Sequence, residues 1–330
     1  MSSGSAPRSR VLSALAALVL AVVTMAATIA LPAVAATKTR LVTGLAGGSG
    51  STVGPDGALY VTESFAGRVS RVDPRTGAVT TYASGLPQAL AAVGIGGAMD
   101  VVFKGGTAYV LVTLVGPDVG GSDVVGVYRV DGPSTSTVIA DIGAFALADP
   151  PPTDFLVPTG VQYAMENFRN GFLVTDGHHN RVYRVRLDGT VTELITFGNI
   201  VPTGLEIRDG TIFMAEAGPV PHLPRDGRVV RFRVGSDTAT EVARGGRLLV
   251  DVEFGAGGRF ALAQGHFTPG NPEGAPADPN TGRLLRIVGD GFRAVAWRLD
   301  RPTSLELIGR NAYVVTLGGE IWRIRLGDDD

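Results

Sequence analysis

Short runs of β-branched and aromatic residues, separated by polar or glycine-rich turns, recur along the chain. Six runs follow one template, in which glycine or asparagine is followed three or four residues later by an arginine and then by an apolar residue. The copies are Gly67–Val72, Gly126–Val130, Asn180–Val185, Gly227–Phe232, Gly282–Ile287 and Gly319–Ile324. One arginine recurs in each: Arg71, Arg129, Arg184, Arg231, Arg286 and Arg323. Their mean spacing is about 50 residues, which is typical of β-propeller blades.

Three further runs accompany each template copy and predict four strands per repeat. The run before it covers Leu59–Glu63, Ala108–Val112, Phe172–Asp176, Ile212–Glu216, Phe260–Gln264 and Ala312–Thr316. The predicted inner strands are Asp100–Phe103, Gly160–Tyr163, Gly204–Ile207, Asp251–Phe254 and Thr303–Leu307. The predicted outer strands are Ala78–Ser84, Thr135–Asp141, Thr190–Thr196, Thr238–Ala243 and Phe292–Leu299. Helical periodicity is confined to Gln88–Ala92.

The last repeat lacks an outer strand, and the segment Thr39–Leu45 resembles the outer strand near Val79–Leu86. We therefore expect an all-β fold, a six-bladed β-propeller of four-stranded blades, with the N-terminal strand completing the last blade. Such closure protects strand edges. The expected propeller covers residues 36–330, with blades at 46–87, 94–142, 157–198, 200–244, 247–299, and 301–326 together with 38–45.

Residues 1–35 have the pattern of a signal peptide. Arg8 and Arg10 precede the apolar stretch Val11–Leu31, and Ala33–Ala35 after Pro32 provides small residues at a cleavage site. We expect cleavage after residue 35 or 36 and a secreted, extracellular protein. The alternative is an uncleaved segment that anchors the protein in a membrane, because about 20 apolar residues can span a bilayer.

Composition excludes several classes of function. The chain has no cysteine, so it has no disulfide framework, thiol nucleophile or cysteine-ligated metal. A net charge of −2 gives no electrostatic footprint for nucleic acid. The sequence contains no phosphate-binding loop, dinucleotide fingerprint or nucleophile elbow. We expect a monomer that binds an extracellular ligand or protein whose identity the sequence does not give.

The segment Val174–Val182 resembles the signature of NHL-repeat propellers, in which a strand, an aspartate, an asparagine and Arg-Val follow in order, and Val61–Val69 is a weaker copy. Over nearly the whole chain after residue 36, the sequence is similar to the ScyD/ScyE family of exported propellers. The segments that carry this similarity are Gly54–Val61, Asp100–Val110 and Pro302–Arg323. The resemblance implies the fold and export, and no defined chemistry. Strictosidine-synthase-like proteins and metal-dependent lactonases are more distant relatives, and none of their site residues is carried over.

We interpret the recurring arginines as packing residues, because a residue present in every blade meets a need that every blade has. A functional site is then expected where the repeat is broken. Four long connections break it: Thr113–Asp123, Ala217–Gly227, Gly265–Gly282 and the insertion Gly143–Val157. In a propeller these connections emerge on one face.

The four histidines lie in the connections of three consecutive blades, beside polar residues that end the preceding strands. The candidate site residues are Glu63, Asp176, His178, His179, Glu216, His222, Gln264 and His266. Imidazoles and carboxylates could ligate a divalent metal or act as a general base. The alternative interpretation is that these side chains hydrogen-bond to backbone amides of their own loops.

Asp100 and Asp251 form a second candidate group at the start of two inner strands, near the channel axis. Carboxylates that converge there could bind Ca²⁺, which takes six to eight oxygen ligands. Two functions follow from these patterns. The favoured one is a binding or scaffold module that uses the loop-elaborated face. The alternative is a metal-dependent hydrolase or lactonase with its site at the channel mouth. Whether the protein is an enzyme stays open at this point.

Overall fold

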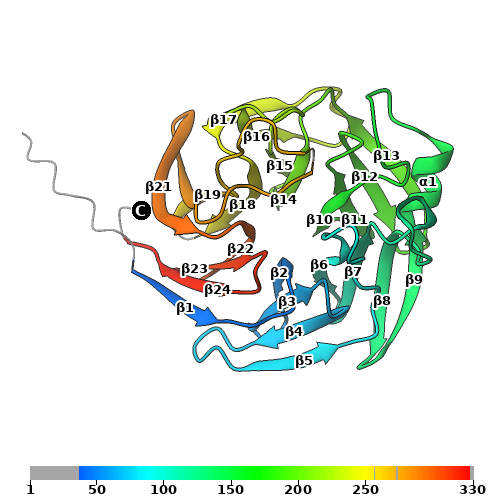
Figure 1. Cartoon of the computed structure of the whole chain (residues 1–330), viewed down its shortest axis with the longest axis horizontal. Coiled ribbons are helices and arrows are strands. Elements are labelled where there is room, and N and C mark those ends of the chain that lie inside the picture. Colours follow the sequence, from blue (N-terminus) through cyan, green and yellow to red (C-terminus); the bar gives the residue numbers. More distant parts are fainter. Residues whose placement is uncertain (1–36, 256, 273, 328–330) are drawn as a thin grey trace, which may run out of the picture. The chain divides into compact units, whose positions relative to one another are not determined.

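The computed structural model describes residues 37–255, 257–272 and 274–327. Six four-stranded antiparallel sheets are arranged around a central axis (Figure 1). The predicted six-bladed β-propeller is therefore confirmed. The predicted signal peptide lies outside the described residues, and no helix within them is long and apolar enough to cross a membrane.

Each blade runs from an inner strand to an outer one. Blade one comprises β2 (Gly48–Val53), β3 (Leu59–Glu63), β4 (Arg68–Val72) and β5 (Val79–Ala83). Blade two comprises β6 (Gly97–Lys104), β7 (Thr107–Thr113), β8 (Gly126–Gly132) and β9 (Thr135–Asp141). Blade three comprises β10 (Gln162–Asn167), β11 (Gly171–Asp176), β12 (Arg181–Arg186) and β13 (Val191–Thr196). Blade four comprises β14 (Pro202–Arg208), β15 (Thr211–Glu216), β16 (Gly227–Phe232) and β17 (Thr240–Gly246). Blade five comprises β18 (Leu249–Gly255), β19 (Gly258–Ala263), β20 (Gly282–Val288) and β21 (Gly291–Leu299). Blade six comprises β22 (Pro302–Ile308), β23 (Asn311–Thr316), β24 (Ile321–Arg325) and β1 (Lys38–Val42).

Burial explains why the second strand of each blade is the most apolar. All five residues of β3 are buried, whereas three of the five residues of the outer strand β5 are exposed. Adjacent sheets pack on both faces of the middle strands, so these strands read as continuous apolar runs. The apolar clusters lie between neighbouring blades, as for Tyr60, Val69 and Val110 of blades one and two.

The sixth sheet joins the two ends of the propeller. Its strand order is β1-β24-β23-β22, and β1 pairs antiparallel with β24. The Nζ of Lys38 donates a hydrogen bond of 2.7 Å to the carbonyl of Trp297, and the guanidinium of Arg40 lies 4.9 Å from the Trp322 ring centre. The expected completion of the last blade by the N-terminal strand is confirmed.

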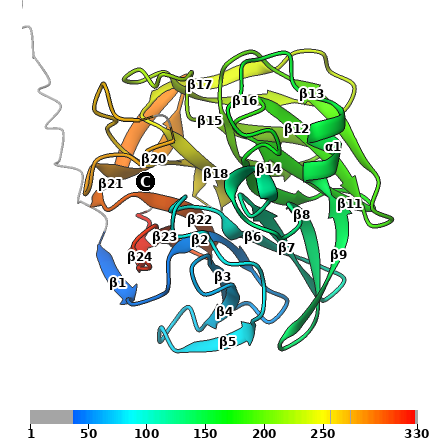
Figure 2. The ribbon, with the colours of Figure 1, turned by 45° about the vertical axis from the view of Figure 1, so that its right-hand side comes forward.

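Two local predictions were wrong. The inner strand of blade three begins at Gln162, because Gly160 adopts a left-handed φ of 78° in a turn closed by its amide to Val157. The segment Gln88–Ala92 is not helical; the α-helix of the described chain is α1 (Ile142–Ala148), within the insertion between blades two and three. Its N-cap Asp141 accepts a 2.7 Å hydrogen bond from the amide of Ala144. Helix α1 lies against β8 and β13 (Figure 2).

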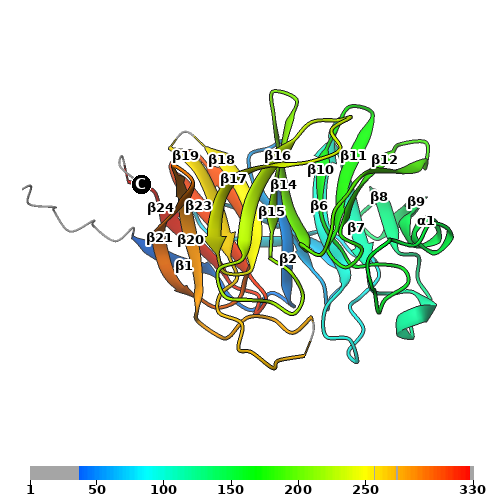
Figure 3. The same cartoon turned by 90° about the horizontal axis from the view of Figure 1, so that it is seen from above.

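The long connections gather on one side of the ring, as predicted. Figure 3 shows the propeller from its edge, with the connections of blades four and five projecting beyond the sheets on one side. Residues from the connections of blades two to five line one cavity there.

Candidate functional site

An apolar cavity of about 300 Å³ lies where these connections meet at the mouth of the central channel. Its walls combine residues that are far apart in the sequence: Val93, Ile95, Leu114, Leu156, Val157, Val161, Tyr163, Gly177, His178, Val201, Pro202, Thr203, Val220, His222 and Gly274. A groove of about 550 Å³ adjoins it and shares Leu156, His178, Val201 and Val220 with it. A concave, mainly apolar space with a few polar groups is the usual form of a small-molecule site.

His178 is one polar group of this cavity, and its Nε2 fixes the position of the insertion loop. The amides of Leu156 and Val157 donate hydrogen bonds of 2.6 and 3.0 Å to this nitrogen. A ring nitrogen that accepts hydrogen bonds carries no proton, so the neutral form of His178 has its one ring proton on Nδ1. The residue therefore joins the third blade to the insertion and presents its ring to the cavity.

His222 and Tyr163 bound the same cavity on other sides. The imidazole of His222 packs edge-on against Phe267, with ring centres 5.2 Å apart. The hydroxyl of Tyr163 donates to the carbonyl of Thr303 at 2.9 Å, and Tyr163 lines both the cavity and the channel below. Of the four predicted histidines, the structure brings His178 and His222 to one cavity.

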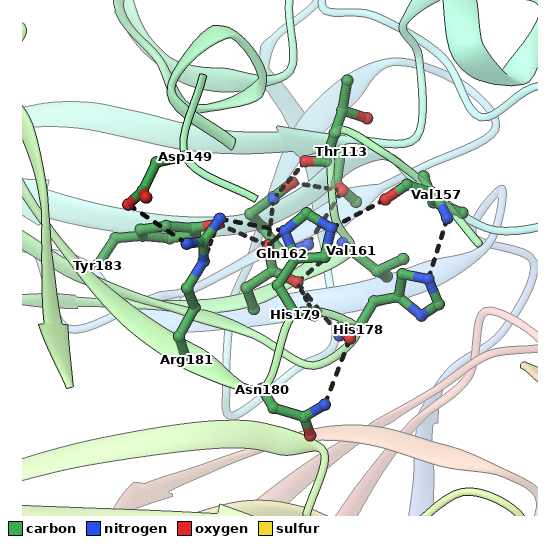
Figure 4. A network of polar contacts seen from close by, with 12 residues as sticks. Thr113, Asp149, Val157, Val161, Gln162, His178, His179, Asn180, Arg181 and Tyr183 are labelled. Carbon is green, nitrogen blue, oxygen red and sulfur yellow. Dashed lines mark hydrogen bonds and ion pairs between the residues drawn. The ribbon is translucent and has the colours of Figure 1, made fainter. Parts of the chain in front are cut away.

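His179, Gln162 and Tyr183 belong to a buried network beside the cavity (Figure 4). The buried carboxylate of Asp176 accepts hydrogen bonds within this network. The Oδ1 of Asp176 accepts hydrogen bonds from the amides of Val161, His178 and His179 at 2.9 to 3.1 Å. Its Oδ2 accepts from the Gln162 side chain at 2.9 Å and from the Tyr183 hydroxyl at 3.0 Å. The carboxylate thus holds the loop that follows its strand, as the alternative interpretation expected.

His179 is fully buried and has a partner at each ring nitrogen. Its Nε2 donates to the carbonyl of Val157 at 3.0 Å, and Arg181 Nη2 donates to its Nδ1 at 3.3 Å. Burial lowers the pKa of His179, and the nearby Asp176 only partly opposes this effect. Neutral His179 is therefore a structural residue, and the predicted catalytic or ligand role does not fit its position.

Glu63 and Glu216 are also buried and pair with arginines at the start of the next strand. Glu63 accepts two hydrogen bonds of 2.8 Å from Arg68, and Glu216 accepts one of 3.0 Å from Arg228. Burial raises the pKa of Glu63, but the bonds from Arg68 and its neighbours outweigh it and the net shift is downward. For Glu216 burial dominates and raises the pKa to about 7. Sequence reasoning missed these arginines, although Arg68 and Arg228 recur at one place in the repeat.

His266 and Gln264 make local contacts in the blade-five connection. The Nδ1 of His266 lies 2.6 Å from the Oδ2 of Asp278, and the Gln264 side chain accepts from the amide of Ala277 at 2.9 Å. The predicted histidines and strand-end residues therefore do not assemble into one site. Among the described residues, no group of three or more His, Asp or Glu side chains could hold a metal ion.

The channel below the cavity is lined with carboxylates from the inner strands. Asp100 and Asp251 are two of them, and each joins neighbouring blades: Asp100 accepts from the amide of Met165 and Asp251 from that of Leu305, both at 2.7 Å. The other oxygen of each accepts the amide of the following residue. Each of the four oxygens accepts one backbone amide, and the described residues form no metal-binding set around them, so the predicted Ca²⁺ site is not confirmed.

Four glutamates lie in or beside this channel and were missed as candidates, although Glu206, Glu253 and Glu306 lie within the predicted inner strands. Glu166, Glu253 and Glu306 line the channel, and the charge of Glu206 acts on Glu166 and Glu253. Burial, reinforced by Coulombic repulsion between these groups, raises the pKa of Glu166 to about 8 and those of Glu253 and Glu306 well above the ordinary range. Burial also raises the pKa of Asp251 to about 7. The cavity mouth is thus apolar, and the channel beneath it is rich in carboxyl groups.

No protein-family model and no curated protein sequence matches the chain. Solved structures resemble it in fold. A gluconolactonase from Xanthomonas campestris has a TM-score of 0.61 at 10% identity, covering 88% of this chain and 90% of its own. A PQQ-bound aldose sugar dehydrogenase from Streptomyces coelicolor has a TM-score of 0.59 at 13% identity, with coverages of 88% and 98%.

A virginiamycin B lyase from Staphylococcus aureus has a TM-score of 0.51 at 14% identity, with coverages of 88% and 99%. Enzymes of different chemistry therefore share this architecture, and function has to be argued from the site rather than from the fold. At these identities the likeness shows the six-bladed β-propeller fold alone.

Proposed function

We propose that this protein is a small-molecule-binding β-propeller that holds a mainly apolar ligand in the mouth cavity. The observation that carries the proposal is the cavity itself, about 300 Å³ in volume and walled by aliphatic side chains from the connections of several blades. A ligand there would bury apolar surface, which contributes about 25 cal/mol per Å². His178, His222 and Thr203 would orient its polar groups.

Exposed apolar side chains at the rim support this proposal. Leu156 is 74% exposed and Leu223 57% exposed, and both belong to connections that border the cavity and its groove. Exposed apolar patches commonly mark ligand-binding grooves or surfaces that bind other molecules. A ligand larger than the cavity would extend over Leu156 into the adjoining groove.

The proposal is tested with Nile red, a neutral apolar dye, titrated into the full chain. We expect saturable fluorescence enhancement at one site per chain and at least a tenfold loss of affinity in Val201→Trp, because the indole fills the cavity. Val138→Trp is the matched control, since Val138 lies exposed on an outer strand. Equal binding by wild type and Val201→Trp would contradict the proposal.

A second proposed function is hydrolysis of an ester or lactone at the channel mouth. It is supported by the fold likeness to the gluconolactonase and by the acidic channel beneath the cavity. The described residues do not fit a metal ion, so no step through a metal is derived. Elemental analysis of the purified chain and a panel of lactones and esters test this function. Turnover that survives in the dye-excluding Val201→Trp variant would separate hydrolysis from binding in the cavity.

We also propose that the protein is exported and is related to the ScyD/ScyE propellers. The proposal is supported by the apolar stretch Val11–Leu31 with its following Ala33–Ala35, and by the segments near Gly54–Val61 and Pro302–Arg323. N-terminal sequencing of the protein recovered from the culture medium tests it. We expect a new terminus at residue 36 or 37, whereas a full-length, membrane-associated chain would support the anchor instead.

A further inference from the structure

In blade five an arginine is retained at a position where blades one and four pair it with a carboxylate. Strand pairing places the last residue of the second strand opposite the first arginine of the third. The pairs are Glu63–Arg68, Asp176–Arg181, Glu216–Arg228 and, in blade five, Ala263–Arg283. The repeat pattern in the sequence predicts Gln264 at this position, but the strand register places Ala263 there instead. No acidic side chain among the described residues forms an ion pair with Arg283.

A cavity of about 230 Å³ lies at this position, between blades four and five. Ala263 forms part of its wall, at the position where blades one, three and four carry an acidic side chain. Arg225 and Arg247 line the same space with Arg283. The rest of the described lining consists of glycine, threonine and apolar residues and contains no carboxylate. Three arginines therefore line one space whose described lining contains no carboxylate.

Guanidinium groups are always protonated and offer only donors, arranged in a fork that matches the oxygens of an oxyanion. In blades one and four the protein fills this position with its own carboxylate, at 2.8 Å from Arg68 and 3.0 Å from Arg228. In blade five an external oxyanion can take the same place above Ala263. Three guanidinium groups balance a doubly charged anion better than a single carboxylate.

We propose that Arg225, Arg247 and Arg283 form a binding site for a phosphate-type dianion, either inorganic phosphate or the phosphate group of a small ester. The site is separate from the mouth cavity, since the two share no lining residue. Arg225 and Arg283 are exposed and Arg247 is half-buried, so the anion can reach the site from solvent and salt will weaken its binding.

Isothermal titration calorimetry tests the proposal by measuring the affinity and stoichiometry with which the full chain binds inorganic phosphate, phenyl phosphate and acetate at low ionic strength. We expect one phosphate per chain, with at least a tenfold loss of affinity in Arg283→Gln and a loss on raising the NaCl concentration. Arg244→Gln is the matched control and should bind normally, because it removes the same charge from an arginine that pairs with Glu241. Comparing inorganic phosphate with phenyl phosphate decides whether the free ion or an ester is preferred.

A second variant adds the missing acid and removes no arginine. Ala263→Glu should place a carboxylate opposite Arg283, as Glu216 stands opposite Arg228, and should abolish phosphate binding. Circular dichroism and the melting temperature check that this variant folds; if it does not, Arg283→Gln and Arg247→Gln decide. Unchanged phosphate binding in Arg283→Gln, no binding by wild type, or acetate binding as tight as phosphate binding would each overturn the proposal.

Discussion

The buried carboxylate of Asp176 illustrates how one residue can hold several segments of a propeller. It accepts hydrogen bonds from three backbone amides, one side-chain amide and one hydroxyl. These donors come from β11's own loop and from β10 and β12, so the carboxylate connects three consecutive segments. Removing it would leave buried donors without partners, which costs more than the net value of a hydrogen bond.

We therefore predict that Asp176→Ala lowers the free energy of unfolding by about 3 kcal/mol or more. Urea denaturation followed by circular dichroism measures the change. Asp188→Ala should have little effect, since Asp188 lies exposed in a turn and accepts from the amide of Thr190. A stable Asp176→Ala protein that has lost ligand binding would instead assign Asp176 to the binding site.

At the scale of elements, the strand β1 decides whether the ring is closed. It covers the edge of β24, and its Lys38 and Arg40 side chains reach Trp297 and Trp322. Without it, β24 would present unpaired backbone groups to solvent, and such edges pair with other chains.

Deleting residues 38–44 should therefore lower the melting temperature by at least about 10 °C and promote aggregation. Differential scanning calorimetry and light scattering measure both effects. Deleting residues 328–330, which lie outside the described chain, is the comparison, and we expect a far smaller change. Equal, small effects of the two deletions would argue that β1 adds nothing to the stability of the ring.

At the scale of the whole molecule, ring closure concentrates carboxyl groups in the channel. Glu166, Glu253 and Glu306 come from three different blades, and their pKa values are raised by burial and mutual repulsion. Lys104 opposes this effect at Glu166, and Arg208 bonds Glu206 at 2.9 Å. A raised pKa means that the folded state favours the protonated carboxyl. The resulting stabilisation is complete below the unfolded pKa of about 4.3 and is lost as pH rises.

We predict that the folded protein is less stable near pH 8.5 than near pH 6.5, and that Glu306→Gln stabilises it at the higher pH. The lowered pKa of His179 acts in the opposite direction, but its contribution is lost only as pH falls below about 6.5. Urea unfolding at both pH values measures the effect. Asp209→Asn, at an exposed turn, is the control. A Glu306→Gln protein with an unchanged pH dependence would contradict the prediction.

Contacts between residues that lie close together in the chain could be predicted from the sequence. The strands around Thr135–Asp141 and Asp251–Phe254 were predicted to within a few residues, because each blade is a series of hairpins whose turns and apolar runs are local. Arg71 and Arg129, which the repeat suggested are packing residues, are 37% and 44% exposed and form ion pairs with Asp56 and Asp131 of their own blades. The same periodicity placed the closing strand Lys38–Val42.

The site depended on contacts that only the closed ring creates. Val93 and Gly274 line one cavity although they belong to connections of different blades, and no local pattern brings them together. The one-residue difference between Gln264 and Ala263 is likewise invisible in an alignment, yet it decides which side chain faces Arg283, because successive residues of a strand point to opposite faces. The blades and their number follow from the repeat pattern, since short apolar runs between local turns define them. Which side chains share a cavity or a charge cluster depends on the packing of the blades around the axis, because that packing sets the distances between them.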